Sequence, residues 1–475
     1  MMTPNLIDEN SIKDKYDYDV LFIHPPYLTE TPPLAFFRDE SFKFSIISSG
    51  ILSIASYLKS KGFSVKIIDT SVDHNYSKIE KELQNKTPKI IGISNNTAFD
   101  YIESLKCLEI TRKNSPSSLI VMGGEHCTYL GDTVFKETNN LDILVHGEGE
   151  ITMELLLTKD KKDYSSIKGI SFMKEDGELH IAREFSDRLK ELPKLDYSLY
   201  PEISQFTPYI EESRGCPKKC KFCLNENLYG CKVTFKPMSL FSEELDQIVN
   251  LWGKNITLAL LTSNFGMSPK IATEQIKILK EKNITWSTQT SVDSNWEIFL
   301  PEAYNAGLRV LTVGFESGSI EILKRINKSA DPKYYIARAE KLIREIAKYP
   351  ELVVKFNIIF YIGETPDTLR ETLDFLLKNQ DYIGTIIYTP LFITPGSEVY
   401  NNFELYAITY GAELLKDEYW SKRHLFPCNP SKHHNFENVV HYCRMIEYIF
   451  SDKAATIKAE SHHYLIKDKE SITES

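Results

Sequence analysis

Residues 208–223 read PYIEESRGCPKKCKFC, a short apolar strand that runs into three closely spaced cysteines. The cysteines are Cys216, Cys220 and Cys223, in the spacing C-x3-C-x2-C. Thiolate sulfur is the ligand that iron–sulfur clusters use, so this loop can hold three corners of a cubane cluster. The remaining iron would lack a protein ligand and could bind a substrate or cofactor.

A zinc site is the alternative interpretation, with Cys231 as the fourth thiolate. The x3-then-x2 spacing is atypical of zinc-binding cysteine pairs. The cysteines also follow a strand, which is where barrel enzymes keep their active sites. We therefore favour the iron–sulfur cluster.

Strand-like and helical segments alternate from this point toward the C-terminus. The candidate strands are 208–213, 256–262, 285–293, 309–316, 353–362 and 385–393. Six such units predict a partial (β/α)6 barrel over residues 204–400, with its chemistry on the loops that follow the strands. The alternation is lost after that, and we expect residues 401–475 to be a helical C-terminal segment.

The preceding part of the chain also alternates. Apolar strands are expected at 18–24, 64–69, 90–94, 119–122 and 143–145. Continuous apolar strands separated by amphipathic helices predict an α/β fold, a doubly wound, Rossmann-like parallel sheet over 18–158. Ligands bind such sheets at the carboxyl ends of the strands. We expect 1–17 to be a polar tail and 159–203 a linker with a small hairpin.

Composition limits the partners and the location. The chain has 475 residues, with 66 acidic and 56 basic side chains and a formal charge of −10. An acidic balance argues against a nucleic-acid partner held mainly by charge. The sequence has no apolar run of membrane-spanning length and no signal-peptide core, so we expect no membrane contact and a cytoplasmic location.

The cysteine array, with Phe222 before its last cysteine, resembles the radical S-adenosylmethionine (SAM) enzymes. Residues 314–319 (GFESGS), 358–363 and 394–397 are similar to further segments of that family. The resemblance implies that the three cysteines bind a [4Fe–4S] cluster whose open iron takes the amino and carboxylate groups of SAM. Reductive cleavage of SAM would then give a 5′-deoxyadenosyl radical.

The resemblance also suggests which residues bind SAM. They are Thr262, Ser263, Gln289, Glu316, Ser317 and Gly318. Glu316 could accept hydrogen bonds from ribose hydroxyls, the alternative being an ion pair within the barrel. The family usually carries Gly-Gly-Glu after its second strand, but residues 261–265 read LTSNF. Thr262, Ser263 or backbone carbonyls would therefore meet the SAM amine. Gln289 and Asp293 are candidates for SAM or substrate, or are ordinary strand-end polar residues.

Two glycine-containing loops resemble the cobalamin-binding domain that one radical SAM subfamily carries ahead of its barrel. They read GGEH at 123–126 and HGEGE at 146–150. Glycines at strand ends let the backbone approach a large flat ring. The expected cobalamin contacts are Ser94, Thr97, Gly123, Gly124, Glu125, His126, Gly147 and Glu148.

No histidine is expected to bind cobalt at the position used by other cobalamin proteins. Their Asp-x-His-x-x-Gly motif is absent, and Asp73-His74 lacks its spacing. We interpret His126 and His146 as hydrogen-bonded loop histidines rather than as cobalt ligands. A nucleotide-binding Rossmann-like domain is the alternative for the whole domain, although G-x-G-x-x-G is missing after its first strand.

The resemblance implies a cobalamin-dependent methyltransferase that acts on an unactivated carbon, or a phosphinate phosphorus, of a small-molecule or peptide substrate. In that mechanism cob(I)alamin takes a methyl group from one SAM, and a second SAM supplies the radical that activates the substrate. An electron donor such as flavodoxin or ferredoxin is implied. The alternatives are ring formation or rearrangement without methyl transfer, and a non-catalytic corrinoid-binding protein with zinc. The sequence identifies no catalytic side chain.

Overall fold

The computed structural model describes residues 16–27, 47–182, 189–383, 385–450 and 454–455. The chain divides into two compact units. Unit 1 comprises Met1–Glu30, Lys43–Ser186 and Leu192–Ile203, and unit 2 comprises Thr31–Phe42, Asp187–Glu191 and Ser204–Ser475. The expected polar tail, 1–17, lies almost wholly outside the described residues. Within those residues, no helix combines the length and apolar character that crossing a membrane requires.

Unit 1 is built on a seven-stranded sheet in the order β2-β1-β3-β4-β5-β6-β7. Its parallel strands are β1 (Tyr18–His24), β2 (Val65–Asp69), β3 (Pro88–Ser94), β4 (Leu119–Gly123) and β5 (Ile143–Val145). They confirm the predicted doubly wound α/β fold. The hairpin β6 (Ile170–Met173) and β7 (Leu179–Ala182), which we expected in a linker, pairs antiparallel with β5 and extends this sheet.

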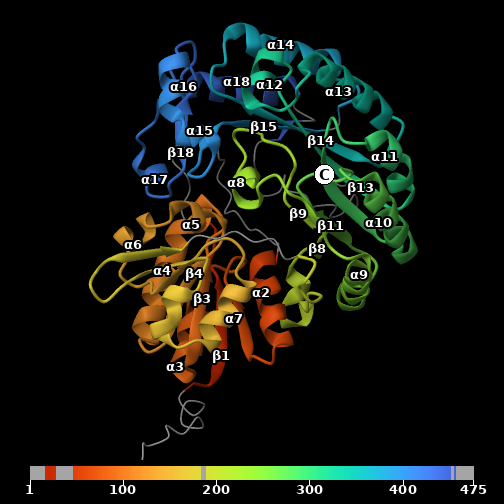
Figure 1. Ribbon diagram of the computed structural model, residues 1–475. Coiled ribbons are helices and arrows are strands. Elements are labelled where there is room, and N and C mark those ends of the chain that lie inside the picture. The colour runs from red at the N-terminus through yellow and green to blue at the C-terminus, as the bar shows by residue number, and fades with distance from the viewer. Residues whose placement is uncertain (1–15, 28–46, 183–188, 384, 451–453, 456–475) are drawn as a thin grey trace, which may run out of the picture. The chain divides into compact units, whose positions relative to one another are not determined.

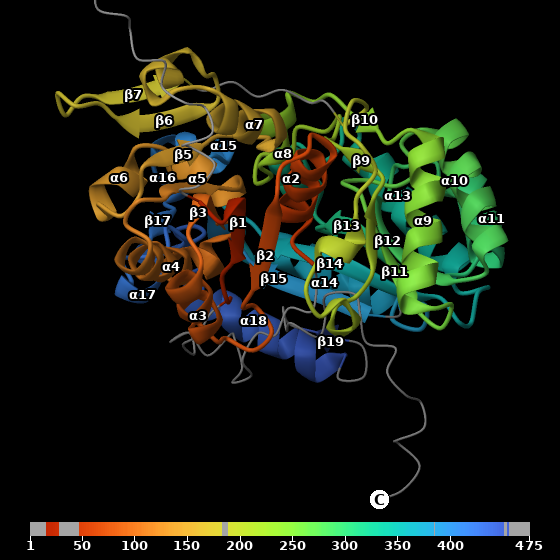
Figure 2. The same ribbon diagram turned by 90° about the horizontal axis from the view of Figure 1, so that it is seen from below.

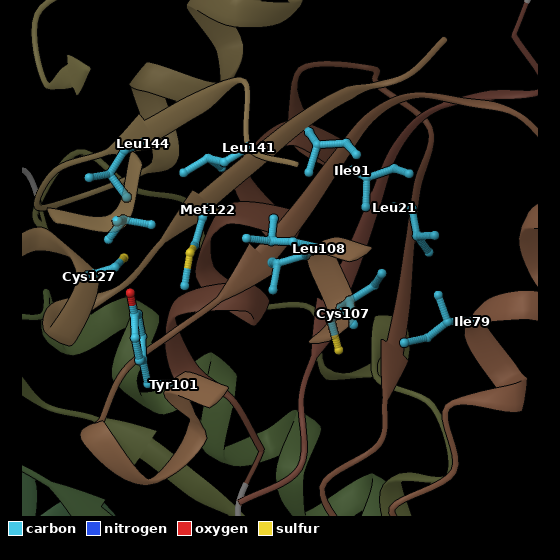
Figure 3. Packing of buried hydrophobic residues seen from close by; sticks show 14 of the residues in the cluster. Leu21, Ile79, Ile91, Tyr101, Cys107, Leu108, Met122, Cys127, Leu141 and Leu144 are labelled. Atoms are coloured by element: carbon cyan, nitrogen blue, oxygen red, sulfur yellow. The ribbon is translucent and has the colours of Figure 1, made fainter. Parts of the chain in front are cut away.

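Helices cover both faces of the unit 1 sheet (Figure 1). One face carries α3 (Ser77–Asn85), α4 (Tyr101–Asn114), α5 (Glu125–Leu130) and α6 (Thr133–Glu137). Figure 3 shows Leu21, Ile91 and Met122 of the strands packed against Ile79 and Leu108 of the helices. The opposite face carries α2 (Ser49–Ser60) and α7 (Glu150–Thr158), which contact each other.

Unit 2 contains a parallel sheet in the order β19-β15-β14-β13-β12-β11-β8. The strands are β8 (Tyr209–Glu211), β11 (Thr257–Leu261), β12 (Thr285–Ser291), β13 (Leu308–Glu316), β14 (Val353–Phe360), β15 (Thr385–Pro390) and β19 (Ala454–Ala455). All but β19 correspond to predicted barrel strands, and the order does not close on itself. The sheet is therefore a partial barrel, as predicted.

The helices of unit 2 follow its strands and line the outer side of the sheet (Figures 1 and 2). They include α9 (Met238–Trp252), α10 (Pro269–Lys282), α11 (Trp296–Asn305), α13 (Pro332–Ile346) and α14 (Pro366–Lys378). Phe315 of β13 stacks on Phe375 of α14 with 4.4 Å between ring centroids. Because successive strand residues point to opposite faces, Gly314 lies on the inner side of the barrel.

The chain after β15 mixes helices with short strands, whereas we expected a helical C-terminal segment. It contains β16 (Phe392–Ile393), α15 (Glu398–Asn401), α16 (Phe403–Tyr410), β17 (Glu413–Leu414), α17 (Glu418–Ser421), β18 (Phe426–Asn429) and α18 (Phe436–Ile449). The strands form a small antiparallel sheet, β16-β18-β17. This sheet ties the segment back to the end of the barrel.

Candidate functional site

The cysteine loop begins after the short strand β9 (Ser213–Arg214), which pairs with β10 (Thr234–Phe235). Gly215 has φ +89°, and a Cβ there would lie 1.9 Å from the carbonyl oxygen of Lys232, so the turn accepts only glycine. Cys216 and Cys220 are buried, and Cys223 is half-buried. The turn therefore sends the chain directly from the sheet into the cysteine array.

Charged side chains surround this array. Burial raises the pKa of the Cys216 thiol, and raises that of Cys220 to about 11, while Lys218 and Lys328 act in the opposite direction. Lys218 is itself held by Asp293, with 2.6 Å between Nζ and Oδ2. Iron would deprotonate the thiols on binding, and the two lysines would then offset the negative charge of the thiolates.

The cysteines are not arranged around one metal ion. A four-thiolate zinc site needs sulfurs that converge on a single point. In the described parts of the chain, no group of three or more His, Cys, Asp or Glu side chains does so. In a cubane cluster each thiolate binds a different iron, so the three sulfurs need not converge on a single point. The residues therefore fit a cluster better than the zinc site that includes Cys231.

Glu316 and Lys328 form an ion pair at the end of β13, with 2.7 Å between Oε1 and Nζ. Both residues are buried, and Glu316 has φ +73° at an irregularity in the pairing of β13 with β14. Burial alone would lower the pKa of Lys328, but the Glu316 carboxylate raises it well above its ordinary value. The structure thus shows the ion pair that we considered as the alternative role of Glu316.

Three of the expected SAM-binding residues connect to the cysteine loop. Gln289 donates from Nε2 to the carbonyl oxygen of Thr262, and Ser263 donates from Oγ to Asn225 Oδ1 at 3.3 Å. Asn225 in turn donates from Nδ2 to Cys223 Sγ at 3.4 Å. The ends of β11 and β12 and the cysteine loop therefore form one polar network.

The other two expected SAM residues pack against α14. Ser317 Oγ lies 3.1 Å from Thr372 Oγ1, and the Gly318 amide donates to the same hydroxyl at 3.0 Å. A Cβ at Gly318 would lie 2.8 Å from Thr372 Cα. These contacts hold the turn after β13 in place, and a direct contact of Ser317 or Gly318 with SAM stays a prediction.

In unit 1, the expected cobalamin loops meet at the carboxyl edge of the sheet. Gly123 ends β4 beside Ser94 of β3. Gly124 has φ +122° and ψ 172°, and a Cβ there would lie 2.3 Å from the carbonyl oxygen of Asn95. We expected this glycine to make room for the corrin ring. The structure gives it a role inside the protein, because only glycine lets the two loops approach so closely.

Three buried polar atoms at this edge have no hydrogen-bond partner within the described residues: His24 Nε2, Ser94 Oγ and Asn95 Oδ1. Buried polar atoms are normally paired, so a group of unmatched ones is a sign of a ligand site. They lie at the ends of β1 and β3, where the strand order β2-β1-β3 reverses direction, which is where open α/β sheets bind ligands. Unmatched polar atoms fit a cofactor that is rich in amide groups, as cobalamin is.

The remaining cobalamin candidates are mostly engaged within the protein. Thr97 Oγ1 accepts a hydrogen bond from the Phe99 amide, and the Gly147 amide donates to Thr128 Oγ1. His126 packs edge-on against Tyr101, and His146 Nε2 lies 2.7 Å from Ser171 Oγ. Glu125 and Glu148 are half-buried, and lost hydration raises the pKa of Glu125 to about 7. His146 is thus a hydrogen-bonded histidine, as we interpreted it.

Sequence reasoning missed two pairs. His24 Nδ1 lies 3.0 Å from Asp69 Oδ2, although the residues are 45 positions apart. Lys328 is 12 positions from Glu316, and we assigned the lysine no role from the sequence. Both pairs join residues at strand ends or in the segments that follow strands. That position is the one signal in the sequence that could have identified them.

Comparison with known protein families identifies both units. The family described as "B12 binding domain" matches residues 39–157, and the "Radical SAM superfamily" matches residues 210–376. The chain contains a B12-binding domain followed by a radical SAM domain. These domains confirm cobalamin, SAM and a [4Fe–4S] cluster as its cofactors.

Known relatives of this B12-binding radical SAM protein cover most of its length. The "uncharacterized methyltransferase PH0819" of Pyrococcus horikoshii is 26% identical over 435 residues, which are 88% of this chain and 91% of that protein. The "anaerobic magnesium-protoporphyrin IX monomethyl ester cyclase" of Rubrivivax gelatinosus is 24% identical over 398 residues, which are 78% of this chain and 68% of that protein.

A solved structure shares the fold. It is the cobalamin-dependent SAM radical enzyme OxsB with aqua-cobalamin and SAM bound, with a TM-score of 0.72 at 19% sequence identity. The match covers 91% of this chain and 66% of that chain. The order of the two folds along the chain is therefore the same as in OxsB.

Proposed function

We propose that this protein is a cobalamin-dependent radical SAM methyltransferase. The methyl group would pass from SAM to an unactivated carbon, or a phosphinate phosphorus, of a small-molecule or peptide substrate. The observation that carries the proposal is the union, in one chain, of a B12-binding domain and a barrel with a three-cysteine loop. The relative that matches over nearly its full length and is named a methyltransferase supports it.

The residues of unit 2 would bind and orient the reactants. When bound, the cluster with SAM supplies a 5′-deoxyadenosyl radical, and cobalamin supplies a transferable methyl group. Cys216, Cys220 and Cys223 hold the cluster. Ser263, hydrogen-bonded to Asn225 of the cysteine loop, and Gln289, hydrogen-bonded to the carbonyl oxygen of Thr262, would meet SAM beside the open iron.

Glu316 and Lys328 would both contribute to the SAM site. The carboxylate accepts hydrogen bonds from ribose hydroxyls, and the lysine stays as a buried cation beside the cysteines. Holding SAM rigidly beside the substrate reduces the entropic cost of the reaction. The inner side of the barrel also keeps water away from a reactive radical.

Two further assignments complete the proposal. Reductive cleavage needs an electron, so we expect a donor protein such as flavodoxin or ferredoxin. A reducing compartment keeps the cysteine thiols available for the cluster, and we expect the protein in the cytoplasm.

The test is product analysis with methyl-labelled SAM and candidate substrates. If one SAM supplies the methyl group and another the radical, S-adenosylhomocysteine and 5′-deoxyadenosine should form in equal amounts. Cys220→Ala should lose 5′-deoxyadenosine, while Cys231→Ala should keep both products. 5′-Deoxyadenosine without S-adenosylhomocysteine would contradict methyl transfer.

That contrary result would favour the second candidate, ring formation or rearrangement without methyl transfer. The specific observation in its favour is the relative named a cyclase, which matches 78% of this chain. A product that carries no methyl label would distinguish ring formation or rearrangement from methyl transfer.

A further inference from the structure

His24 is fixed on one side of its imidazole ring by the neighbouring strand. It is the last residue of β1, and Asp69, the last residue of β2, lies opposite it in the register of the sheet. His24 is only 1% exposed, and its Nδ1 lies 3.0 Å from Asp69 Oδ2. The backbone of the sheet therefore builds this pair.

Asp69 is itself held in place by hydrogen bonds to both of its carboxyl oxygens. Its Oδ1 accepts hydrogen bonds from the Ser71 amide at 2.7 Å and from Ser71 Oγ at 2.6 Å. Its Oδ2 also accepts a hydrogen bond from Tyr200 Oη. The Ser48 amide in turn donates a hydrogen bond to Tyr200 Oη at 3.0 Å.

The Asp69 carboxyl group lies at Nδ1 of His24, so Nε2 is the nitrogen that is left for a ligand. A metal binds the neutral imidazole through Nε2 while Nδ1–H donates to the carboxylate. That Nε2 atom is buried and has no hydrogen-bond partner within the described residues. Histidines that bind metals almost always donate their other ring N–H to a carboxylate or carbonyl. His24 and Asp69 have this arrangement, with Nε2 left for a metal.

The position of His24 fits a ligand of the bound cofactor. Ile23 of β1 pairs with Ile93 of β3, so His24 and Ser94 end adjacent strands side by side. This is the point where the strand order reverses, and it also holds the unmatched Ser94 Oγ and Asn95 Oδ1. The Tyr27 ring packs edge-on against the imidazole, with 5.6 Å between centroids.

We propose that His24 Nε2 is an axial ligand of the cobalt in bound cobalamin, and that Asp69 is its positioning residue. The ligand would come from the end of β1 itself, in a chain that lacks the Asp-x-His-x-x-Gly motif. This proposal rests on cobalamin binding by unit 1 and is independent of methyl transfer.

The test is electron paramagnetic resonance of the full-length protein loaded with cobinamide and reduced mildly to cobalt(II). Cobinamide lacks the nucleotide base of cobalamin, so any axial nitrogen must come from the protein. The wild type should show a nitrogen superhyperfine triplet, which becomes a doublet when the protein carries nitrogen-15-labelled histidine. Protein that retains cobinamide without nitrogen splitting would overturn the proposal while leaving corrinoid binding intact. Protein that retains no corrinoid would overturn both.

Variants assign the nitrogen to one residue. His24→Ala should lose the triplet, and Asp69→Asn should lower the fraction of cobalt that shows it. His146→Ala is the matched control, because His146 is also buried and directly follows a strand, β5, at the same edge of the sheet. It should keep the triplet. A triplet that persists in His24→Ala would overturn the assignment.

Discussion

At the scale of single residues, one buried ion pair lies where chemistry is expected. The side chains of Glu316 and Lys328 are 6% and 7% exposed, and a Cβ on Gly314 would lie within 3 Å of both. Removing one partner of such a pair leaves an uncompensated charge in a poorly solvating interior. The pair is therefore a source of stability only as long as it stays complete.

Lys328→Met should lower the free energy of unfolding by about 3–5 kcal/mol, because Glu316 is left buried and unpaired. Lys328→Met combined with Glu316→Gln should recover most of that loss. Urea denaturation of the single and double variants measures both values. Equal stability of wild type and Lys328→Met would mean that solvent reaches Glu316.

Glu364 is a buried carboxyl group that follows β14. Thr368 donates a hydrogen bond to Oε2 of Glu364. The backbone carbonyl oxygen of Glu364 accepts another from Ser431 Oγ at 2.6 Å. Burial raises the pKa of Glu364 to about 8, against an ordinary value of 4.5. The folded protein therefore holds a proton here that the unfolded chain releases at lower pH.

Glu364→Gln should remove a pH dependence of stability. In the wild type, the stability associated with the protonated group is complete below a pH of 4.5 and is lost as the pH rises through about 8. At pH ~9 the variant should be more stable than the wild type by more than about 1.4 kcal/mol, the value of one pKa unit. Thermal unfolding across this range measures it, and parallel curves for the two proteins would contradict the prediction.

At the scale of elements, local patterns predict strands and helices well and their partners less well. Strand β1 has the bounds that the apolar pattern indicated. The hairpin of β6 and β7 was recognised, but its pairing with β5 was not, because short strands carry no local signal of their neighbour. In the same way, Cys216, Cys220 and Cys223 were found from spacing, whereas His24 and Asp69 meet only through strand register.

The cysteine loop gives a direct prediction. Cys216→Ala, Cys220→Ala and Cys223→Ala should each lose the cluster, because two thiolates leave two irons without protein ligands. Cys231→Ala should retain it. Iron content and visible absorbance after anaerobic purification measure this. Normal iron content in any of the first three variants would contradict the assignment, and cluster loss in Cys231→Ala would revive the four-cysteine interpretation.

The loop that starts at Gly124 gives another prediction. Gly124→Ala should destabilise the protein by about 1–3 kcal/mol, the cost of a backbone conformation that essentially only glycine adopts. Contact with the carbonyl oxygen of Asn95 would add to that cost. The matched control is Gly50→Ala in α2, where a Cβ meets nothing within 4 Å. Its stability should be unchanged or slightly higher, and equal losses in the two variants would contradict the account.

At the scale of the whole molecule, the function depends on two cofactor sites in one chain. Unit 1 offers unmatched polar atoms at the switch point of a parallel sheet, and unit 2 offers a cysteine loop in a polar network at its strand ends. The sequence predicted both folds and their cofactors, because glycine loops and cysteine spacings are local patterns. It left the substrate open, since substrate contacts come from residues that are distant in sequence.

The most direct test of this account is cofactor analysis of the full-length protein, purified anaerobically, reconstituted with iron, sulfide and hydroxocobalamin, and freed of unbound material by gel filtration. We predict one corrinoid and one [4Fe–4S] cluster per chain, measured as cobalt, iron and sulfide on the same sample. Protein that holds zinc without iron and sulfide, or that elutes without cobalt, would contradict the central claim.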